Sequence, residues 1–276
     1  LEYDLSKIVT NLANPNRRIV GLYTDLPMLG TFNPLAKSQD AAAAPPWAIY
    51  NQMNEFFEIT RIHEKTKFIP ENLELLMLVH PKKIPEGLLY SIDQFVLKGG
   101  KLLVFVDPNS ETESFSPNNN PVQKENGNSS DLKELLDKWG LELVQDKVVG
   151  DLLSARRVQI GESDQPSVTD YIAWIDIKKD HMDDSHQATS KVQRLTFATS
   201  GFLKNNKKNN NISFKRLVWS TKQSMQIDVN DVKLNPDPTD LLRNFVPSNE
   251  ELTLVAEIKG TFTSNFPQGP PKTNRK

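Results

Sequence analysis

Two polar residues, His80 and Asp107, each follow a short apolar run and precede a proline, and they carry the side chains of a general base and its orienting carboxylate. A second interpretation is simpler. A histidine before proline at a strand end often serves as a hydrogen-bonded loop residue, and Asp-Pro often opens a turn. A hydrolase using this pair would need a nucleophile or a metal, and the sequence has no Gly-x-Ser-x-Gly elbow. We therefore expect no catalytic residue and interpret the chain as non-enzymatic.

Sequence motifs for metal binding, cysteine chemistry and nucleotide binding are absent or weak. His181 to His186 is the only cluster with metal-ligand residue types, and its spacing of five does not place both histidines on one helix face, so we expect a solvated loop and no metal. The sequence has no cysteine, which removes disulfides, thiolate ligands and cysteine nucleophiles. Neither a GxGxxG nor a GxxxxGK[ST] motif occurs, so we expect no nucleotide and no other cofactor.

The elements around His80 and Asp107 predict a parallel βαβ unit. Leu75 to Val79 and Leu102 to Val106 are continuous apolar runs, typical of strands buried on both faces, and the amphipathic stretch Ile84 to Leu97 between them predicts a helix that stops at Gly99. Functional loops of open parallel sheets lie beyond the carboxyl ends of the strands, which predicts that His80 and Asp107 share one edge.

The stretch before this unit predicts further α/β structure. Arg18 to Tyr23 and Phe57 to Ile62 are expected strands, and Pro45-Pro46 opens an amphipathic helix between them. The connection Thr24 to Pro45 is long and irregular, which is more typical of a functional loop than of an ordinary one. The candidate crevice for a ligand or partner comprises the residues at the strand ends and around this loop: His80, Asp107, Thr24, Asp25 and Trp47.

The pattern changes after about residue 150. Short alternating segments with one helical candidate, Pro238 to Phe245, predict a smaller β-rich portion, and residues 108 to 130 predict a polar surface loop with little to bury. We therefore expect an amphipathic lead-in (1–15), an α/β domain (16–150), a β-rich domain (151–266) and a flexible tail (267–276). The expected strands of the second portion are Val168 to Ile175, Val192 to Phe197, Ile212 to Trp219, Met225 to Val229 and Leu252 to Ile258.

Composition excludes several classes of protein. The formal charge is -2, from 33 basic and 35 acidic residues, so no net field attracts nucleic acid. No apolar stretch approaches the ~20 residues that span a bilayer. The sequence shows no signal peptide and begins at Leu1 without methionine, so we expect an excised or processed segment.

Several motifs together resemble the extracytoplasmic region of GldG-like proteins, auxiliary components of an uncharacterised ABC transport system named for its link to gliding motility. The resemblance covers nearly the whole chain and is most specific around Gly99-Gly100. It is carried by Pro46-Trp47, His80-Pro81-Lys82, Ile92 to Pro108, Trp139-Gly140, Asp146 to Asp151, Ala256 to Gly260 and Phe266-Pro267.

The resemblance implies a fold, a location and partners. It implies a first domain similar to flavodoxin-like and class I glutamine amidotransferase folds, whose amidotransferase chemistry this cysteine-free sequence lacks the nucleophile to perform. It also implies a periplasmic module held by flanking transmembrane helices beside separate permease and ATPase subunits. No catalytic residue is transferred. The alternative function is a solute- or glycan-binding domain that uses the crevice near His80 and Asp107.

Overall fold

The computed structural model describes residues 16–30, 44–114, 127–161, 166–233 and 236–271, with Glu2, Leu5, Val9, Leu12 and Ala13. The predicted lead-in, the middle of the Thr24 to Pro45 loop and the end of the predicted tail lie largely outside these residues. The chain forms two compact units: residues up to Phe105 with those from Phe266 onward, and Val106–Asn265. No helix in the described part of the chain is long and apolar enough to span a bilayer.

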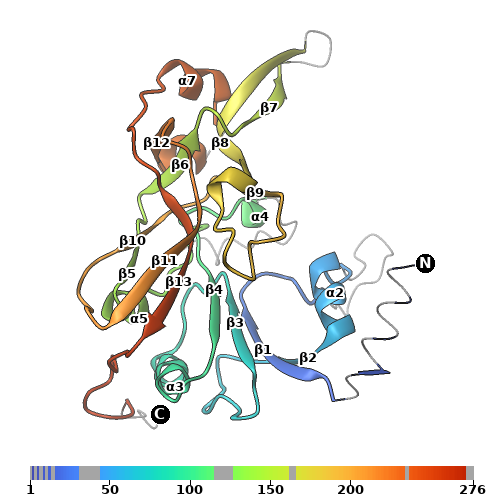
Figure 1. Cartoon of the computed structure of the whole chain (residues 1–276), viewed down its shortest axis with the longest axis vertical. Helices are drawn as coiled ribbons and strands as arrows, with labels where there is room; N and C mark the ends of the chain where they lie inside the picture. Colours follow the sequence, from blue (N-terminus) through green and yellow to red (C-terminus); the bar gives the residue numbers. More distant parts are fainter. Residues whose placement is uncertain are drawn as a thin grey trace, which may run out of the picture. The chain divides into compact units, whose positions relative to one another are not determined.

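The first unit contains one four-stranded sheet in the order β2-β1-β3-β4, with every neighbouring pair parallel (Figure 1). The predicted βαβ unit is confirmed, since β3 and β4 pair in parallel with Met77 opposite Leu103. The strands and the helix predicted before it also form. The bounds are β1 Arg18–Thr24, α2 Ala48–Phe56, β2 Phe57–Arg61, β3 Leu75–Val79, α3 Glu86–Leu97 and β4 Leu102–Phe105.

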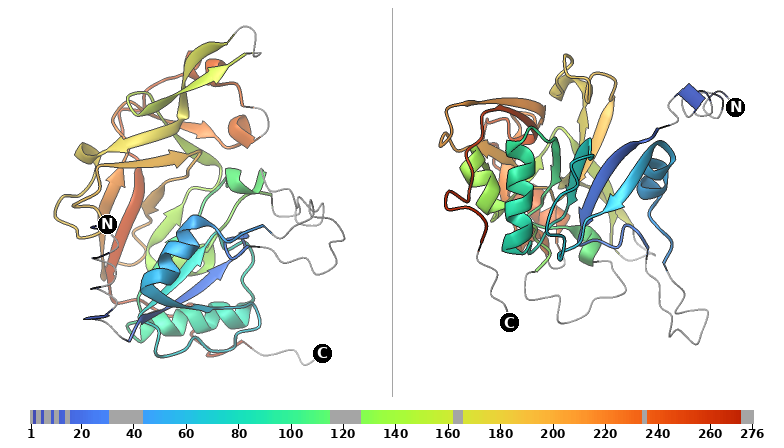
Figure 2. Two further views of the ribbon diagram at one scale, coloured as in Figure 1. Left: turned by 90° about the vertical axis from the view of Figure 1, so that its right-hand side faces the viewer. Right: turned by 90° about the horizontal axis from the view of Figure 1, so that it is seen from below.

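Helix α3 runs beside the four strands of this sheet (Figure 2). Its apolar residues Leu88 and Ile92 are buried, as are Leu76 and Leu78 of β3. Each buried leucine or isoleucine contributes about 1.5–3 kcal/mol relative to an exposed one, so this contact surface stabilises the unit. The helix ends where Gly99 adopts a φ of +91°, a conformation that glycine takes without steric cost.

The last part of the chain returns to the first unit. The ring of Phe266 packs edge-on against the ring of Tyr90 in α3, with 5.4 Å between the ring centroids. Such aromatic pairs contribute about 0.5–1.5 kcal/mol beyond the area they bury. Phe266 is therefore an anchor that precedes the predicted tail.

The second unit is β-rich, with three sheets of orders β11-β13-β10-β5, β12-β6 and β7-β8-β9 (Figure 1). All of its strand pairs are antiparallel. All five strands predicted in this part of the chain form, and so does the helix at Pro238. The bounds are α4 Glu111–Ser114, α5 Lys133–Trp139, β5 Leu141–Leu143, β6 Lys147–Asp151, β7 Ala155–Ile160, β8 Ser167–Lys178, a 3-10 helix Lys179–His181, β9 Arg194–Ala198, β10 Leu203–Asn205, β11 Ile212–Trp219, β12 Ser224–Asp228, α6 Asn230–Lys233, α7 Pro238–Arg243 and β13 Thr253–Gly260.

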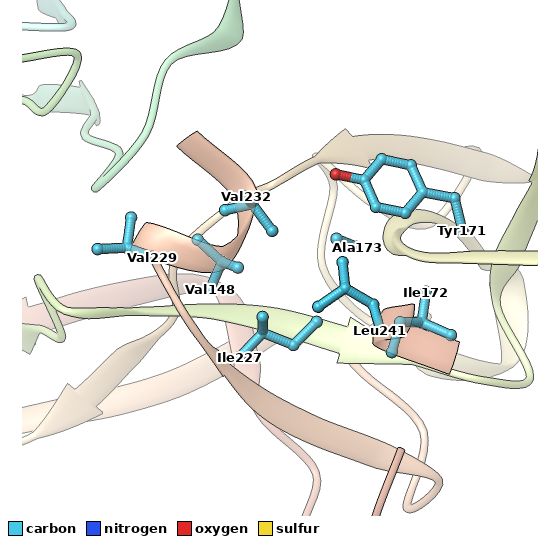
Figure 3. Close-up of a cluster of buried hydrophobic side chains, with 8 residues drawn as sticks. All are labelled: Val148, Tyr171, Ile172, Ala173, Ile227, Val229, Val232 and Leu241. Atoms are coloured by element: carbon cyan, nitrogen blue, oxygen red, sulfur yellow. The ribbon is translucent and has the colours of Figure 1, made fainter. Parts of the chain in front are cut away.

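The core of the second unit joins elements distant in sequence (Figure 3). One cluster brings side chains of β6, β8 and β12 together with residues of α6 and α7. Ile172 and Ala173 of β8 are fully buried there, as is Val148 of β6. The cluster consists of Val148, Tyr171, Ile172, Ala173, Ile227, Val229, Val232 and Leu241.

The two units divide the chain differently from the predicted ranges. Strands β5 and β6, which lie at the end of the range 16–150 predicted for the first domain, pair with β10 and β12 of the second unit. The second unit therefore begins at Val106, and it is the longer of the two.

The prediction that residues 108 to 130 form a surface loop with little to bury is partly wrong, because the described ends of this stretch are buried in the second unit. Asn109 is 2% exposed, and its side-chain amide donates a hydrogen bond to Oγ1 of Thr199 at 3.1 Å. Ser130 is also buried, and helix α4 lies within the stretch. Sequence composition could not show this, since the partner Thr199 is 90 residues away.

Candidate ligand or partner crevice at the strand ends

The carboxyl ends of the parallel strands place several of the predicted residues at one edge of the first unit. Thr24 is the last residue of β1, and Asp25 follows it, while His80 directly follows β3. The strand order reverses between β1 and β3, because β2 lies on one side of β1, and β3 and β4 lie on the other. In open parallel sheets, ligands bind beyond the strand ends at such a reversal.

Asp25 joins the loop after β1 to the loop after β3. Its Oδ2 accepts a hydrogen bond from the backbone N–H of Lys82 at 2.8 Å. Burial raises the pKa of Asp25, and the negative charge of Glu64 raises it further. The hydrogen bond from the N–H of Lys82 lowers this pKa. His80 and Lys82 also lie close enough to lower this pKa. Asp25 and His80 therefore lie close enough to interact, and their use as one binding crevice stays a prediction.

His80 occupies a strained backbone position. Its φ is +51°, in the left-handed region, and the residue is only 3% exposed. Its N–H donates to the carbonyl oxygen of Phe105 at 2.8 Å, which continues the β3–β4 pairing by one residue. A non-glycine residue in this region costs on the order of 1 kcal/mol and is held there by its surroundings. This hydrogen bond and the burial of His80 fix the start of the loop after β3.

Thr24 and Trp47 hold the ends of the long loop. The Oγ1 of Thr24 accepts a hydrogen bond from the N–H of Leu26 at 3.1 Å, which closes a turn. The N–H of Trp47, the residue before α2, donates to the carbonyl of Met28 at 3.0 Å. At Gly30, whose φ is +80°, a Cβ atom would lie 2.5 Å from the carbonyl oxygen of Ala44. The two ends of the loop therefore lie side by side.

Asp107 lies in the second unit, whereas His80 lies in the first. The Oδ1 of Asp107 accepts a hydrogen bond from the N–H of Asn109 at 3.0 Å, and its own N–H donates to Oγ of Ser130 at 2.8 Å. Burial raises the pKa of Asp107 to about 7, against the opposing N–H groups of Asn109 and Gly201. Asp107 therefore holds both ends of the 108–130 stretch, with its carboxyl bonded to Asn109 and its backbone N–H bonded to Ser130. Its membership of one crevice with His80 stays a prediction.

A hollow of about 660 Å³ lies at the carboxyl ends of β1 and β2, and we call it the strand-end hollow. Its volume lies within the roughly 300–1,000 Å³ typical of small-molecule sites, although it is open to solvent. Sequence reasoning identified Thr24 and Asp25 but missed the contribution of the segment after β2. The lining residues are Tyr23, Thr24, Asp25, Arg61, Ile62, His63, Glu64, Lys65 and Thr66.

The strand-end hollow combines both signs of charge. Glu64 and Asp25 lie on it together with Arg61 and Lys65. Burial raises the pKa of Tyr23 far above its usual value, and the carboxylates of Asp25 and Glu64 add to the effect, so the Tyr23 hydroxyl stays neutral. Such a surface can bind polar groups through hydrogen bonds and ion pairs. A signal for the missed segment was present in sequence, since His63 and Glu64 directly follow the predicted strand end.

The histidines of the 181–186 stretch make other contacts in the second unit. The Nε2 of His186 lies 3.1 Å from Oε1 of Glu257, and its Nδ1 accepts a hydrogen bond from the N–H of Ala188 at 3.2 Å. The ring of His181 lies edge-on to that of Trp219. Within the residues that the structure describes, no three histidine, cysteine or acidic side chains are grouped so that they could hold a metal ion.

Comparison with known proteins places the chain in a family. Residues 17–276 match a family described as an ABC-type uncharacterized transport system. The members of this family are the auxiliary components of that system. No curated protein matches, and no solved structure matches. Because the match covers nearly the whole chain, the protein belongs to the family of auxiliary components of this ABC-type transport system.

Proposed function

We propose that the chain is a non-enzymatic, GldG-like binding module that works outside the cytoplasmic membrane beside the permease and ATPase subunits of its transport system. The family match supports a role in transport. The observation that carries the binding role is the hydrogen bond between Asp25 and Lys82, since it holds two loops at the sheet edge where partners and ligands usually bind.

The proposal includes a fold relation for the first unit. The order β2-β1-β3-β4 is that of the first four strands of a flavodoxin-like sheet, which supports the flavodoxin-like or amidotransferase-like assignment. One difference is that residues 62–74, between β2 and β3, contain no helix. The amidotransferase reaction itself has no cysteine nucleophile in this sequence.

Site-specific photocrosslinking in intact cells tests the partner. A photoreactive residue at Lys65 or Thr66, on the strand-end hollow, should crosslink to the permease. The matched control is Glu71, which is exposed and forms an ion pair with Lys98 at 3.2 Å. Both Glu71 and Lys98 precede strands, so they lie at the opposite, amino-end edge of the same sheet.

The two sets of positions separate the possible outcomes. We expect a permease adduct from Lys65 and none from Glu71. Equal adducts from both edges, or no adduct to any membrane component, would contradict the proposed surface.

Protease added to intact spheroplasts should cleave the protein, and complete protection there would contradict the proposed location.

The volume of the strand-end hollow supports a second candidate, a solute- or glycan-binding domain. A ligand that binds only the native state raises the unfolding free energy by RT ln(1 + [L]/Kd), about 2.7 kcal/mol at a hundredfold excess over Kd. A thermal-shift screen of sugars and small polar solutes should then give a shift that Asp25→Asn abolishes. A flat screen together with a permease crosslink favours the first function.

A further inference from the structure

In the part of the chain that the structure describes, strand β7 is paired on one side only. In the described residues it is the edge of the three-stranded sheet β7-β8-β9 and pairs only with β8, with Arg157 opposite Asp170 and Val158 opposite Thr169. The backbone N–H and C=O groups on the outer side of an edge strand are a template for a further strand.

A hollow of about 570 Å³ lies along this strand, and we call it the β7 groove. One wall consists of the four consecutive residues from Arg157 to Ile160. Tyr171 and Trp174 of the neighbouring strand β8 also line it, so the groove lies over the paired strands β7 and β8, beside the free edge of β7. The lining also contains Pro236 and Pro238, which have no backbone N–H to donate to a neighbouring strand.

The remaining lining of the groove is aromatic and rigidly held. The rings of Tyr171 and Trp174 lie 5.4 Å apart between centroids, and both residues line the groove. The Nε1 of Trp174 donates to Oε1 of Glu111 at 2.8 Å, which fixes the indole ring. Tyr171 is 3% exposed. Held aromatic rings of this kind offer an apolar side chain a contact that costs little conformational entropy.

The charge on the strand indicates the partner. The side chain of Arg157 is 82% exposed, and its ion pair with Asp170, at 3.5 Å, is a surface pair that contributes little. Arg157 can therefore take a new carboxylate at small cost. Pairing with β7 of a second copy would bring Arg156 and Arg157 of both copies together, and like charges across a strand pair destabilise it. The occupant that fits is an acidic one.

We propose that the β7 groove binds an extended segment of a partner protein, which adds as a fourth strand to β7 and alternates apolar with acidic residues. Its backbone pairs with the free edge, one apolar side chain lies on the partly exposed Trp174, and a carboxylate lies beside Arg157. This mode of recognition draws affinity from main-chain hydrogen bonds and specificity from alternate side chains.

Fluorescein-labelled synthetic peptides test the proposal on the full chain. The probe is fluorescein-Ser-Glu-Phe-Glu-Val-Glu-Thr-Gly-NH2, compared with a version in which lysine replaces each glutamate and with one N-methylated at alternate residues. Fluorescence anisotropy measures binding, and amide hydrogen exchange of β7 reports strand addition. Arg157→Glu is the test variant. Arg194→Glu on β9, the opposite edge of the same sheet, is the matched control, since that side chain is 63% exposed and also faces a carboxylate.

The charge swap makes the result decisive. We expect the glutamate peptide to bind the native chain and Arg194→Glu equally, and Arg157→Glu about tenfold more weakly, as one exposed charge pair turns repulsive. Arg157→Glu should prefer the lysine peptide, the N-methylated peptide should not bind, and bound peptide should protect the β7 amides. Binding unaffected by N-methylation or by Arg157→Glu would overturn the proposal. So would no binding of any peptide, or self-association through β7.

Discussion

Replacing Asp107 by asparagine should remove a pH dependence from the stability of the second unit. Burial raises the pKa of this carboxyl from 3.8 to about 7, so the folded state holds a proton that the unfolded chain releases. The free energy of unfolding must therefore fall as the pH rises from 3.8 to about 7, and below this window the penalty is absent.

The size of the effect follows from the width of the window. Between pH 3.8 and about 7, each pH unit changes the free energy of unfolding by about 1.4 kcal/mol, which gives an upper limit of ~4 kcal/mol. The Asp107 residue is partly exposed, and solvent screens its charge, so we expect about 2 kcal/mol. Relative to the native chain, Asp107→Asn should gain about this much stability between pH 4 and pH 8.

Urea denaturation at pH 4 and pH 8 measures the difference, with tryptophan fluorescence as the signal, since Trp139, Trp174 and Trp219 all lie in the second unit. The amide introduced by Asp107→Asn faces the N–H of Gly201 less favourably than the carboxyl does, but this cost does not change with pH and cancels between the two measurements. A difference that stays within ~0.5 kcal/mol, a change of the opposite sign, or a carboxyl that titrates near 4 by NMR would refute the reasoning.

Three further changes test individual contacts. Tyr171→Phe removes a buried hydroxyl that has no hydrogen-bond partner in the described structure, so urea denaturation should show equal or higher stability, by up to ~1 kcal/mol, and a clear loss would show that the hydroxyl is satisfied. Gly140→Ala should lower stability by about 1–2 kcal/mol, because Gly140 ends α5 at φ +98° and a Cβ would lie 2.6 Å from Cδ1 of Ile212; an unchanged midpoint would contradict this. Asp183→Asn should lower the free energy of unfolding at pH 7, because the Lys215 ammonium at 2.6 Å and Ser185 lower the pKa of Asp183. This contribution is complete above the usual carboxyl pKa and shrinks as the pH falls from there toward the lowered pKa, so urea denaturation should show the difference between variant and native chain narrowing from pH 7 to pH 2; a constant difference would contradict this.

The site shows how far sequence reasoning reaches. Thr24, Asp25 and His80 could be placed at one edge, because the carboxyl ends of parallel strands meet there. The bond from Asp25 to Lys82 spans 57 residues, and nothing local in either stretch indicates it. For Asp107, the apolar run before it indicated a strand end, but its hydrogen bond to Asn109 and its contact with Gly201 depend on how the second unit packs.

The sequence by itself determined the elements whose signals are local. The βαβ unit, the end of α3 before Gly99 and the strand Ile212–Trp219 each follow from periodicity and from breakers within a few residues. Strands β7 and β10 were missed, because their polar residues show no burial pattern and only their neighbours make them strands. The pairing of β5 with β10 and of β6 with β12 was decided only by the tertiary structure. Backbone hydrogen bonds between strands do not depend on residue type, so the partner and register of a short strand are set by which distant side chains share its core.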